Sequence, residues 1–241
     1  MTLTPYNCPM SEARALELID WLGLESDDFV LDAGCGRAAF LMEVLRASGS
    51  MGFGVDIDAA ALAIAEQDGA DLIQAGHLTL SKADLQSGIS EDKAFQASVC
   101  LGSTHAFEEG EAAFPSALTQ LSQSTRFDGR ILIGECFWKT VPAAEYLTIL
   151  GEPVGIYRSH DENLACVEQI GLRVLKSSVS TDREWDRFER DHLRRAEMKV
   201  QESPADEVAF ASLEGHQEWY SAYEQWGRST LGFGFYLIDK S

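Results

Sequence analysis

The 241-residue sequence lacks any apolar run of about 18 residues, so we expect no membrane-spanning helix. Its first ten residues lack the basic segment and apolar stretch of a signal peptide. No CxxC pair occurs, and the five cysteines are scattered, which favours reduced thiols in a cytoplasmic protein. Four histidines show no ligand spacing with a cysteine or an acid: His77, His160, His192 and His216. We therefore predict no metal site.

Basic residues are also scarce. Lys and Arg total 19 against 39 Asp and Glu, which gives a net charge of −20. No basic stripe is available to neutralise phosphates, so the charge disfavours nucleic acid as a partner. The sequence contains no repeat and no low-complexity linker. Its length and its hydrophobic content of 45% predict a single α/β domain over residues 1–241.

Strand and helix patterns alternate along most of the chain. Strands are predicted at 29–32, 51–56, 77–81, 94–101, 130–136, 172–177 and 233–238, and helices at 11–22, 37–47, 58–67, 111–124 and 163–170. This alternation predicts a Rossmann-like, seven-stranded, mostly parallel sheet with helices on both faces. Residues 181–228 are helical in pattern, aromatic and charged. They predict a helical insert before the last strand, either a cap or a flank that only buries the sheet edge. Its charged run, 182–195, is interpreted as a solvated helix face.

The most informative segment is VLDAGCG at residues 30–36, an apolar strand followed by an acid and two glycines. Apolar residues at helical spacing come next, so a strand, a tight turn and a helix N-terminus follow one another. This arrangement brings a ligand close to the backbone and points free N–H groups at it. The GxGxxA pattern of residues 34–39, with Asp56 roughly 20 residues on, is also typical of dinucleotide-binding folds.

Two further acids favour S-adenosylmethionine over a nicotinamide cofactor. Asp32, at the end of the first strand, can meet an α-amino group, whereas a site for pyrophosphate has little use for a carboxylate at this position. Asp84, after the third strand, can accept a hydrogen bond from an adenine amino group. Asp32, Asp56 and Asp84 thus predict a binding crevice at the carboxyl edge of the sheet.

Four segments together resemble the successive motifs of class I S-adenosylmethionine-dependent methyltransferases. They are VLDAGCG (30–36), GVDID (54–58), KADLQ (82–86) and SVCLGSTHAF (98–107). The segment 127–135 resembles that family's turn and fifth strand, although Asp128-Gly129 stands where a proline-glycine is commoner. The resemblance covers residues 11–178 and the last strand. It is strongest to an uncharacterised bacterial group of small methyltransferases, through the segments 102–104, 134–138 and 185–188.

The resemblance implies a role for each matching position. Asp32, Gly34, Cys35 and Gly36 would surround the methionine end of the cofactor, and Asp56 would bind both ribose hydroxyls. Ile57 would lie against the adenine, Asp84 and Leu85 would hold its edge, and Leu101 and Gly102 would pass under the sulfonium.

Three residues after the fourth and fifth strands are candidates for catalysis. His105 could remove a proton, since an imidazole titrates near neutral pH, or could only shape the pocket. Glu135 could orient a polar acceptor or pair with an arginine of the insert. Trp138 could stack on the acceptor or pack beneath the insert. The sequence thus predicts methyl transfer to a small-molecule acceptor; an NAD(P)-dependent oxidoreductase and a non-catalytic S-adenosylmethionine-binding protein remain the alternatives.

Overall fold

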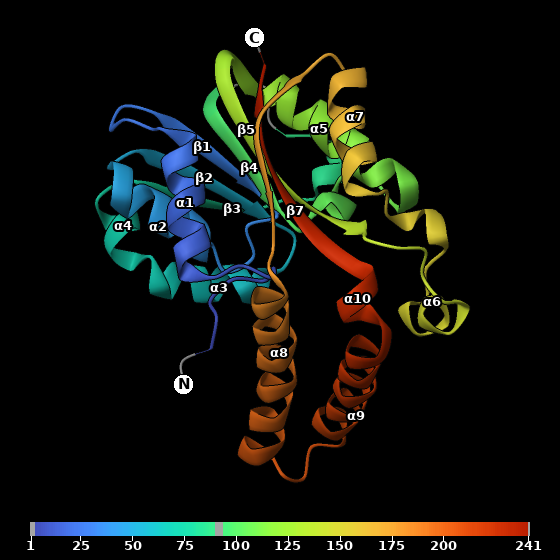
Figure 1. Cartoon of the computed structure of the whole chain (residues 1–241). Coiled ribbons are helices and arrows are strands. Elements are labelled where there is room, and N and C mark those ends of the chain that lie inside the picture. Colours follow the sequence, from blue (N-terminus) through green and yellow to red (C-terminus); the bar gives the residue numbers. More distant parts are fainter. Residues whose placement is uncertain (1–2, 90–93, 241) are drawn as a thin grey trace.

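A computed structural model describes residues 3–89 and 94–240, and in these ranges seven strands form one sheet. The strands are β1 (Phe29–Ala33), β2 (Met51–Asp56), β3 (Leu78–Lys82), β4 (Phe95–Leu101), β5 (Thr125–Trp138), β6 (Arg173–Val179) and β7 (Leu231–Asp239). Their order across the sheet is β3-β2-β1-β4-β5-β7-β6. β7 runs antiparallel to both β5 and β6, and the other pairs are parallel. The predicted seven-stranded, mostly parallel sheet is confirmed (Figure 1).

Helices cover both faces of this sheet. They are α1 (Glu12–Leu22), α2 (Ala39–Ser48), α3 (Ala59–Asp68), α4 (Ala70–Gln74), α5 (Ala113–Ser124), α6 (Ala144–Leu150), α7 (His160–Gln169), α8 (Asp182–Glu202), α9 (Glu207–Ala222) and α10 (Arg228–Thr230). Alternate residues of each strand enter different cores: Val30 packs with α1 and α2, and Leu31 packs with α5 and α7. Because both faces are buried, the central strands are continuous apolar runs.

The structure differs from the prediction in the bounds of β5 and in the helices that follow it. β5 begins at Thr125, five residues before the predicted start, so the segment 127–129 belongs to the strand. A side chain at Gly129 would meet the Gln96 carbonyl oxygen at 2.8 Å, so this position requires glycine. Helix α6 was not predicted. α7 begins at 160 rather than 163 because Ser159 and Glu162 form a capping box that our prediction overlooked.

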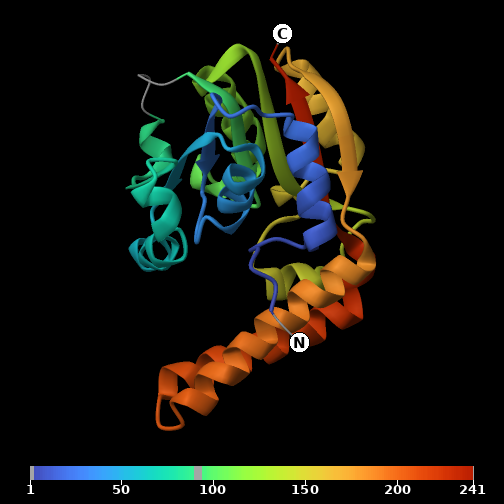
Figure 2. The same cartoon turned by 90° about the vertical axis from the view of Figure 1, so that its left-hand side faces the viewer.

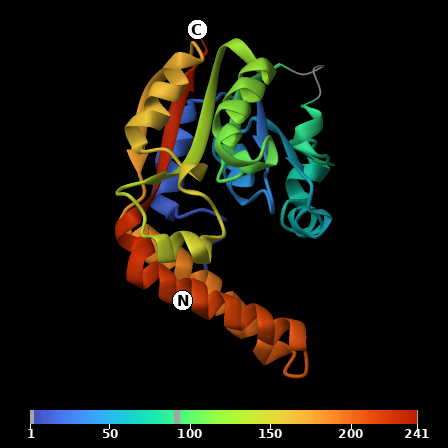
Figure 3. The ribbon, with the colours of Figure 1, turned by 90° about the vertical axis from the view of Figure 1, so that its right-hand side faces the viewer.

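The predicted helical insert is a hairpin of two antiparallel helices, α8 and α9. It projects from the sheet in views from two opposite sides (Figure 2, Figure 3). A π-helical turn, Tyr223–Gly227, and α10 lead from α9 into β7. Trp185 stacks on Tyr223 with ring centroids 6.2 Å apart, and Trp219 lies near Tyr146 of α6 at 6.4 Å. Aromatic packing therefore fixes the hairpin to its neighbours.

The interpretation of 182–195 as a solvated face is wrong in part, because Glu184, Glu189 and Asp191 are buried. Two of these acids hold the segment before α1. The Asp191 carboxylate accepts a hydrogen bond from the Thr4 amide at 2.7 Å, and Glu184 accepts from the Ser11 hydroxyl at 2.8 Å. Burial of an acid is tolerated where hydrogen bonds compensate it.

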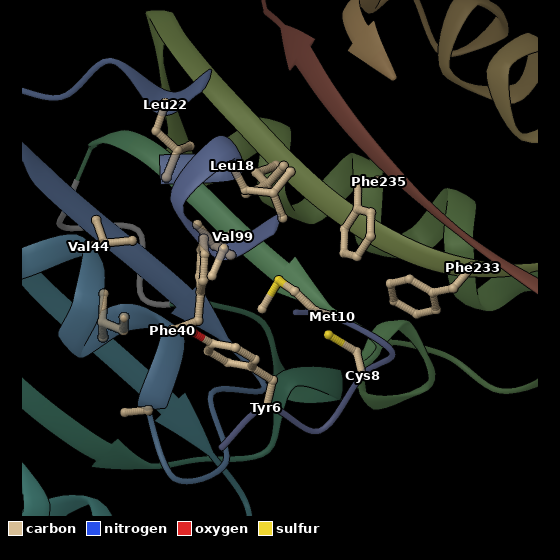
Figure 4. Packing of buried hydrophobic residues seen from close by; sticks show 14 of the residues in the cluster. Tyr6, Cys8, Met10, Leu18, Leu22, Phe40, Val44, Val99, Phe233 and Phe235 are labelled. Atoms are coloured by element: carbon tan, nitrogen blue, oxygen red, sulfur yellow. The ribbon is translucent and has the colours of Figure 1, made fainter. Parts of the chain in front are cut away.

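Residues 3–10, here called the N-terminal segment, lie beside α8 and enter the core. Tyr6, Cys8 and Met10 are each at most 4% exposed and pack near Phe40 and Phe233 (Figure 4). The Arg195 guanidinium donates to the Thr4 carbonyl, and the Ser180 hydroxyl donates to the Pro9 carbonyl at 2.6 Å. The hairpin and the core together fix this segment across the carboxyl ends of the strands.

Candidate functional site

The turn after β1 has the backbone conformation that its glycines permit. Gly34 has φ of +76° and Gly36 has φ of +53°, a region that most side chains avoid. A side chain at Gly34 would collide with Ser103 at 2.3 Å, because the loop after β4 crosses directly over the turn. No atom lies within 4 Å of the Cβ position at Gly36, which opens onto a cavity. The turn therefore leaves bare backbone facing that space.

The first cavity, of about 580 Å³, lies at the carboxyl ends of β1, β2 and β4. From the sheet edge it is lined by Asp32, Gly34, Cys35, Gly36, Asp56, Leu101, Gly102 and His105. The N-terminal segment contributes Pro5, Tyr6, Asn7, Cys8 and Met10, and α8 contributes His192, Arg195 and Lys199. β1 lies where the sheet order reverses direction, the usual ligand site of such sheets.

Asp32 is a buried acid in the wall of this cavity, with 6% of its surface exposed. Burial, and secondarily the nearby Asp56 carboxylate, raises its pKa to about 7. No described residue donates a hydrogen bond to it. A cationic group beside Asp32 would stabilise its ionised form. The cavity therefore suits a ligand that carries an ammonium group.

Asp56 is held in place by the backbone around it. Its two carboxylate oxygens accept hydrogen bonds from the amides of Gly36 and Asp58 at 2.7 and 2.8 Å. Each carboxylate oxygen can accept more than one hydrogen bond, so capacity remains for a ligand hydroxyl. This geometry fits the predicted contact with ribose.

Three of the predicted cofactor residues lie outside the lining of the first cavity. Ile57 is 61% exposed. The Asp84 carboxylate accepts from the Gln86 amide at 3.0 Å at the start of a short 3-10 turn, and Leu85 is buried in the core beside α5. The structure does not bring these side chains to the cavity wall formed by Asp32 and Asp56.

A second cavity, of about 370 Å³, adjoins the first. It contains Glu135, which is 8% exposed, accepts from the Thr104 hydroxyl, and accepts from the Cys136 amide at 2.7 Å. Burial raises the pKa of Glu135 to about 7. Its lining further includes Phe114, Glu152, Tyr157, Arg158, Asn163, Trp185, Phe188 and Phe233. The second cavity is thus lined by aromatic side chains and by a few acidic and basic groups.

The two cavities share four lining residues, Asn7, Cys8, Gly102 and His105. We call this set the junction. His105 is exposed and lies in a 3-10 turn, Thr104–Ala106, that begins after β4. Ligands in the two cavities would approach each other here.

Trp138 is buried outside the lining of either cavity. Its indole N–H donates to the Val154 carbonyl at 2.7 Å, and its ring packs against Tyr146 and Tyr157. Trp138 thus has packing contacts, one of them with Tyr157, which lines the second cavity.

Sequence reasoning missed two parts of the site. No motif marks the N-terminal segment, whose place depends on contacts with Ser180 and with Asp191 of α8, 171 and 187 positions away. Arg158 and Tyr157 follow a loop that returns to β5, where the Trp138 amide donates to the Arg158 carbonyl at 2.9 Å. Long-range contacts of this kind leave no local pattern.

Within the described ranges, no group of three or more potential metal ligands gathers. Nor does any helix in these ranges have the length and apolar character needed to cross a bilayer.

Residues 30–129 match the family model described as "Methyltransferase domain". An S-adenosylmethionine-dependent methyltransferase from Geobacter sulfurreducens, solved with S-adenosyl-L-homocysteine, is 24% identical with a TM-score of 0.88, covering 98% of this chain and 93% of that one. A second from Thiobacillus denitrificans, with the same ligand, is 23% identical with a TM-score of 0.86, covering 97% and 93%. The Escherichia coli (strain K12) "Uncharacterized protein YjhP" is 22% identical over 235 residues, which are 95% of this chain and 92% of that protein.

Proposed function

We propose that this chain, whose residues 30–129 form a methyltransferase domain, binds S-adenosylmethionine in the first cavity and methylates a small molecule held in the second. The predicted family and enzyme class are confirmed at the level of that domain, and two similar structures hold the cofactor's demethylated product. The observation that carries the proposal is the junction, because donor and acceptor cavities that meet at Gly102 and His105 suit group transfer.

In the donor cavity, Asp32 binds the ammonium group of the cofactor and Asp56 binds its ribose hydroxyls. Gly34 and Gly36 would let the methionine part approach the backbone, with Cys35 as a small residue between them, and Leu101 and Gly102 would line the sulfonium region. The adenine would extend beyond the lining of the first cavity toward Ile57, Asp84 and Leu85, to which the resemblance assigns it.

When bound, S-adenosylmethionine supplies an electrophilic methyl group, so the protein needs no nucleophile of its own. Its tasks are to align the acceptor, exclude water and accept a proton where the acceptor releases one. His105 at the junction accepts that proton. Glu135, fixed by Thr104 and Cys136, orients a polar group of the acceptor.

The helical hairpin and the N-terminal segment close the donor cavity within a single domain. We therefore interpret 181–228 as a cap and not only as a flank. The second cavity has a volume in the usual range of small-molecule sites, roughly 300–1,000 Å³, and the net charge of −20 argues against a polynucleotide. All five cysteines are free thiols, which supports a cytoplasmic location.

The test is transfer of label from methyl-labelled S-adenosylmethionine into a cytosolic metabolite extract. We expect label in a small molecule with the wild-type protein and much less with Asp56→Ala. Binding of the cofactor without transfer across a broad metabolite panel would favour the non-catalytic alternative.

A further inference from the structure

Among the described elements, only α8 lines the first cavity with basic side chains and no acid, through His192, Arg195 and Lys199. The sheet edge contributes the acids Asp32, Asp56 and Asp58, together with one arginine, Arg37. The α8 residues are three and four positions apart, so they lie on one face of the helix. Because the chain as a whole has a net charge of −20, a basic helix face that lines a cavity suggests an anionic ligand.

The charge of Asp191 acts on Arg195 and His192 from one turn or less along α8, but that carboxylate accepts from the Thr4 amide and pairs with Arg187. Neither Arg195 nor Lys199 forms an ion pair within the described part of the chain, whereas the cavity's other arginine, Arg37, pairs with Asp68 at 3.6 Å. Arg195 uses one nitrogen to hold the Thr4 carbonyl, and a guanidinium has further N–H donors to offer.

The third residue of this face has an unused polar atom. Nε2 of His192 is buried and has no hydrogen-bond partner within the described residues. Burial, followed by the positive charge of Arg195, lowers the pKa of His192 to about 4, so its ring is neutral at physiological pH. In the tautomer that carries its proton on Nε2, the neutral ring donates a hydrogen bond to an anion.

We infer that the α8 face formed by His192, Arg195 and Lys199 binds the carboxylate of the amino-acid moiety of the donor. This inference rests on the proposed function. S-adenosylmethionine carries one anionic group, its methionine carboxylate, and cations are the complementary partners. Asp32 on the sheet and α8 on the hairpin would then hold the two ends of one zwitterion.

The hairpin would then bind the cofactor as well as pack against its neighbours. Arg195 contacts both the N-terminal segment and the cavity, and Asp191, one turn earlier, holds the Thr4 amide. A carboxylate at Arg195 would therefore fix α8 and the N-terminal segment over the bound cofactor.

The test compares S-adenosylhomocysteine with 5′-methylthioadenosine, which lacks the amino-acid moiety, by calorimetry. We expect Lys199→Ala to weaken binding of S-adenosylhomocysteine about threefold or more, and Arg195→Ala about tenfold or more, because charge-assisted contacts are lost. Affinity for 5′-methylthioadenosine should stay within about twofold in both variants. Arg194→Ala, an exposed arginine of the same helix, is the matched control and should change neither affinity.

Unchanged affinity for S-adenosylhomocysteine in both variants would overturn the inference, and so would an equal loss for the two ligands. A wild-type protein that binds neither ligand would instead refute the proposed function, on which the inference depends. Lys199→Ala keeps the test valid if Arg195→Ala fails to fold, since Lys199 is exposed.

Discussion

Binding of S-adenosylhomocysteine should depend on pH through Asp32. The carboxyl group is buried in the cavity wall, and its pKa is raised to about 7 in the free protein. A ligand ammonium favours the ionised form, so at low pH binding must first remove a proton. At about pH 6 only roughly one molecule in ten has Asp32 ionised, which costs about 1.4 kcal/mol, or tenfold in affinity, relative to about pH 8.

Calorimetric titrations between about pH 5.5 and 8.5 measure this dependence. The affinity should rise by nearly tenfold per pH unit below 7 and level off above it. Asp32→Asn has the same shape without the charge. It should bind about 1–3 kcal/mol more weakly at pH 8 and lose the pH dependence. 5′-Methylthioadenosine, which has no ammonium group, should show little dependence in either protein.

The reasoning would be refuted by a wild-type affinity that is flat across this range. It would equally be refuted by a slope that persists unchanged in Asp32→Asn, because another group would then be responsible.

Three further predictions follow from the same geometry. Asp56→Ala should weaken S-adenosylhomocysteine and 5′-methylthioadenosine alike by about 1–3 kcal/mol in calorimetry, since both carry the ribose; unchanged affinity would mean that the ribose lies elsewhere. His105→Ala should lower the turnover of methyl transfer while nearly keeping cofactor affinity, and unaffected turnover would show that deprotonation needs no group of the enzyme. Burial raises the pKa of Asp32, Glu135 and Glu189 to about 7, so the native state keeps protons that the unfolded chain releases from about pH 4 upward. The unfolding free energy of the free protein, measured by urea titration, should therefore fall as pH rises toward 7 and then level off; a rise over that window would argue against these buried acids.

Local patterns predicted the sheet well because each central strand is buried on both faces. Val30 and Leu31 enter opposite cores, which produces the continuous apolar runs that mark β1. The glycine turn was also predictable, since two glycines after an acid indicate it, and Gly34 and Gly36 do adopt positive φ. The donor half of the site follows from these local features.

The other half depends on contacts between distant parts of the chain. Cys8 lies at the junction because Ser180 and Asp191 fix the N-terminal segment. Likewise, the burial of Asp191 follows from its partner Thr4 and not from the charged sequence around it. The spacing of apolar and charged residues along the sequence reveals no contact between distant segments. The sequence analysis therefore missed the N-terminal segment and the basic face of α8.

The cofactor is the central claim, and one calorimetric comparison tests it most directly. The GxGxxA turn and Asp56 fit both an S-adenosyl compound and NAD as the ligand. Only S-adenosylhomocysteine carries an ammonium group, which suits Asp32. The account predicts measurable binding of S-adenosylhomocysteine and none of NAD under the same conditions. Tight binding of NAD with no binding of S-adenosylhomocysteine would contradict it.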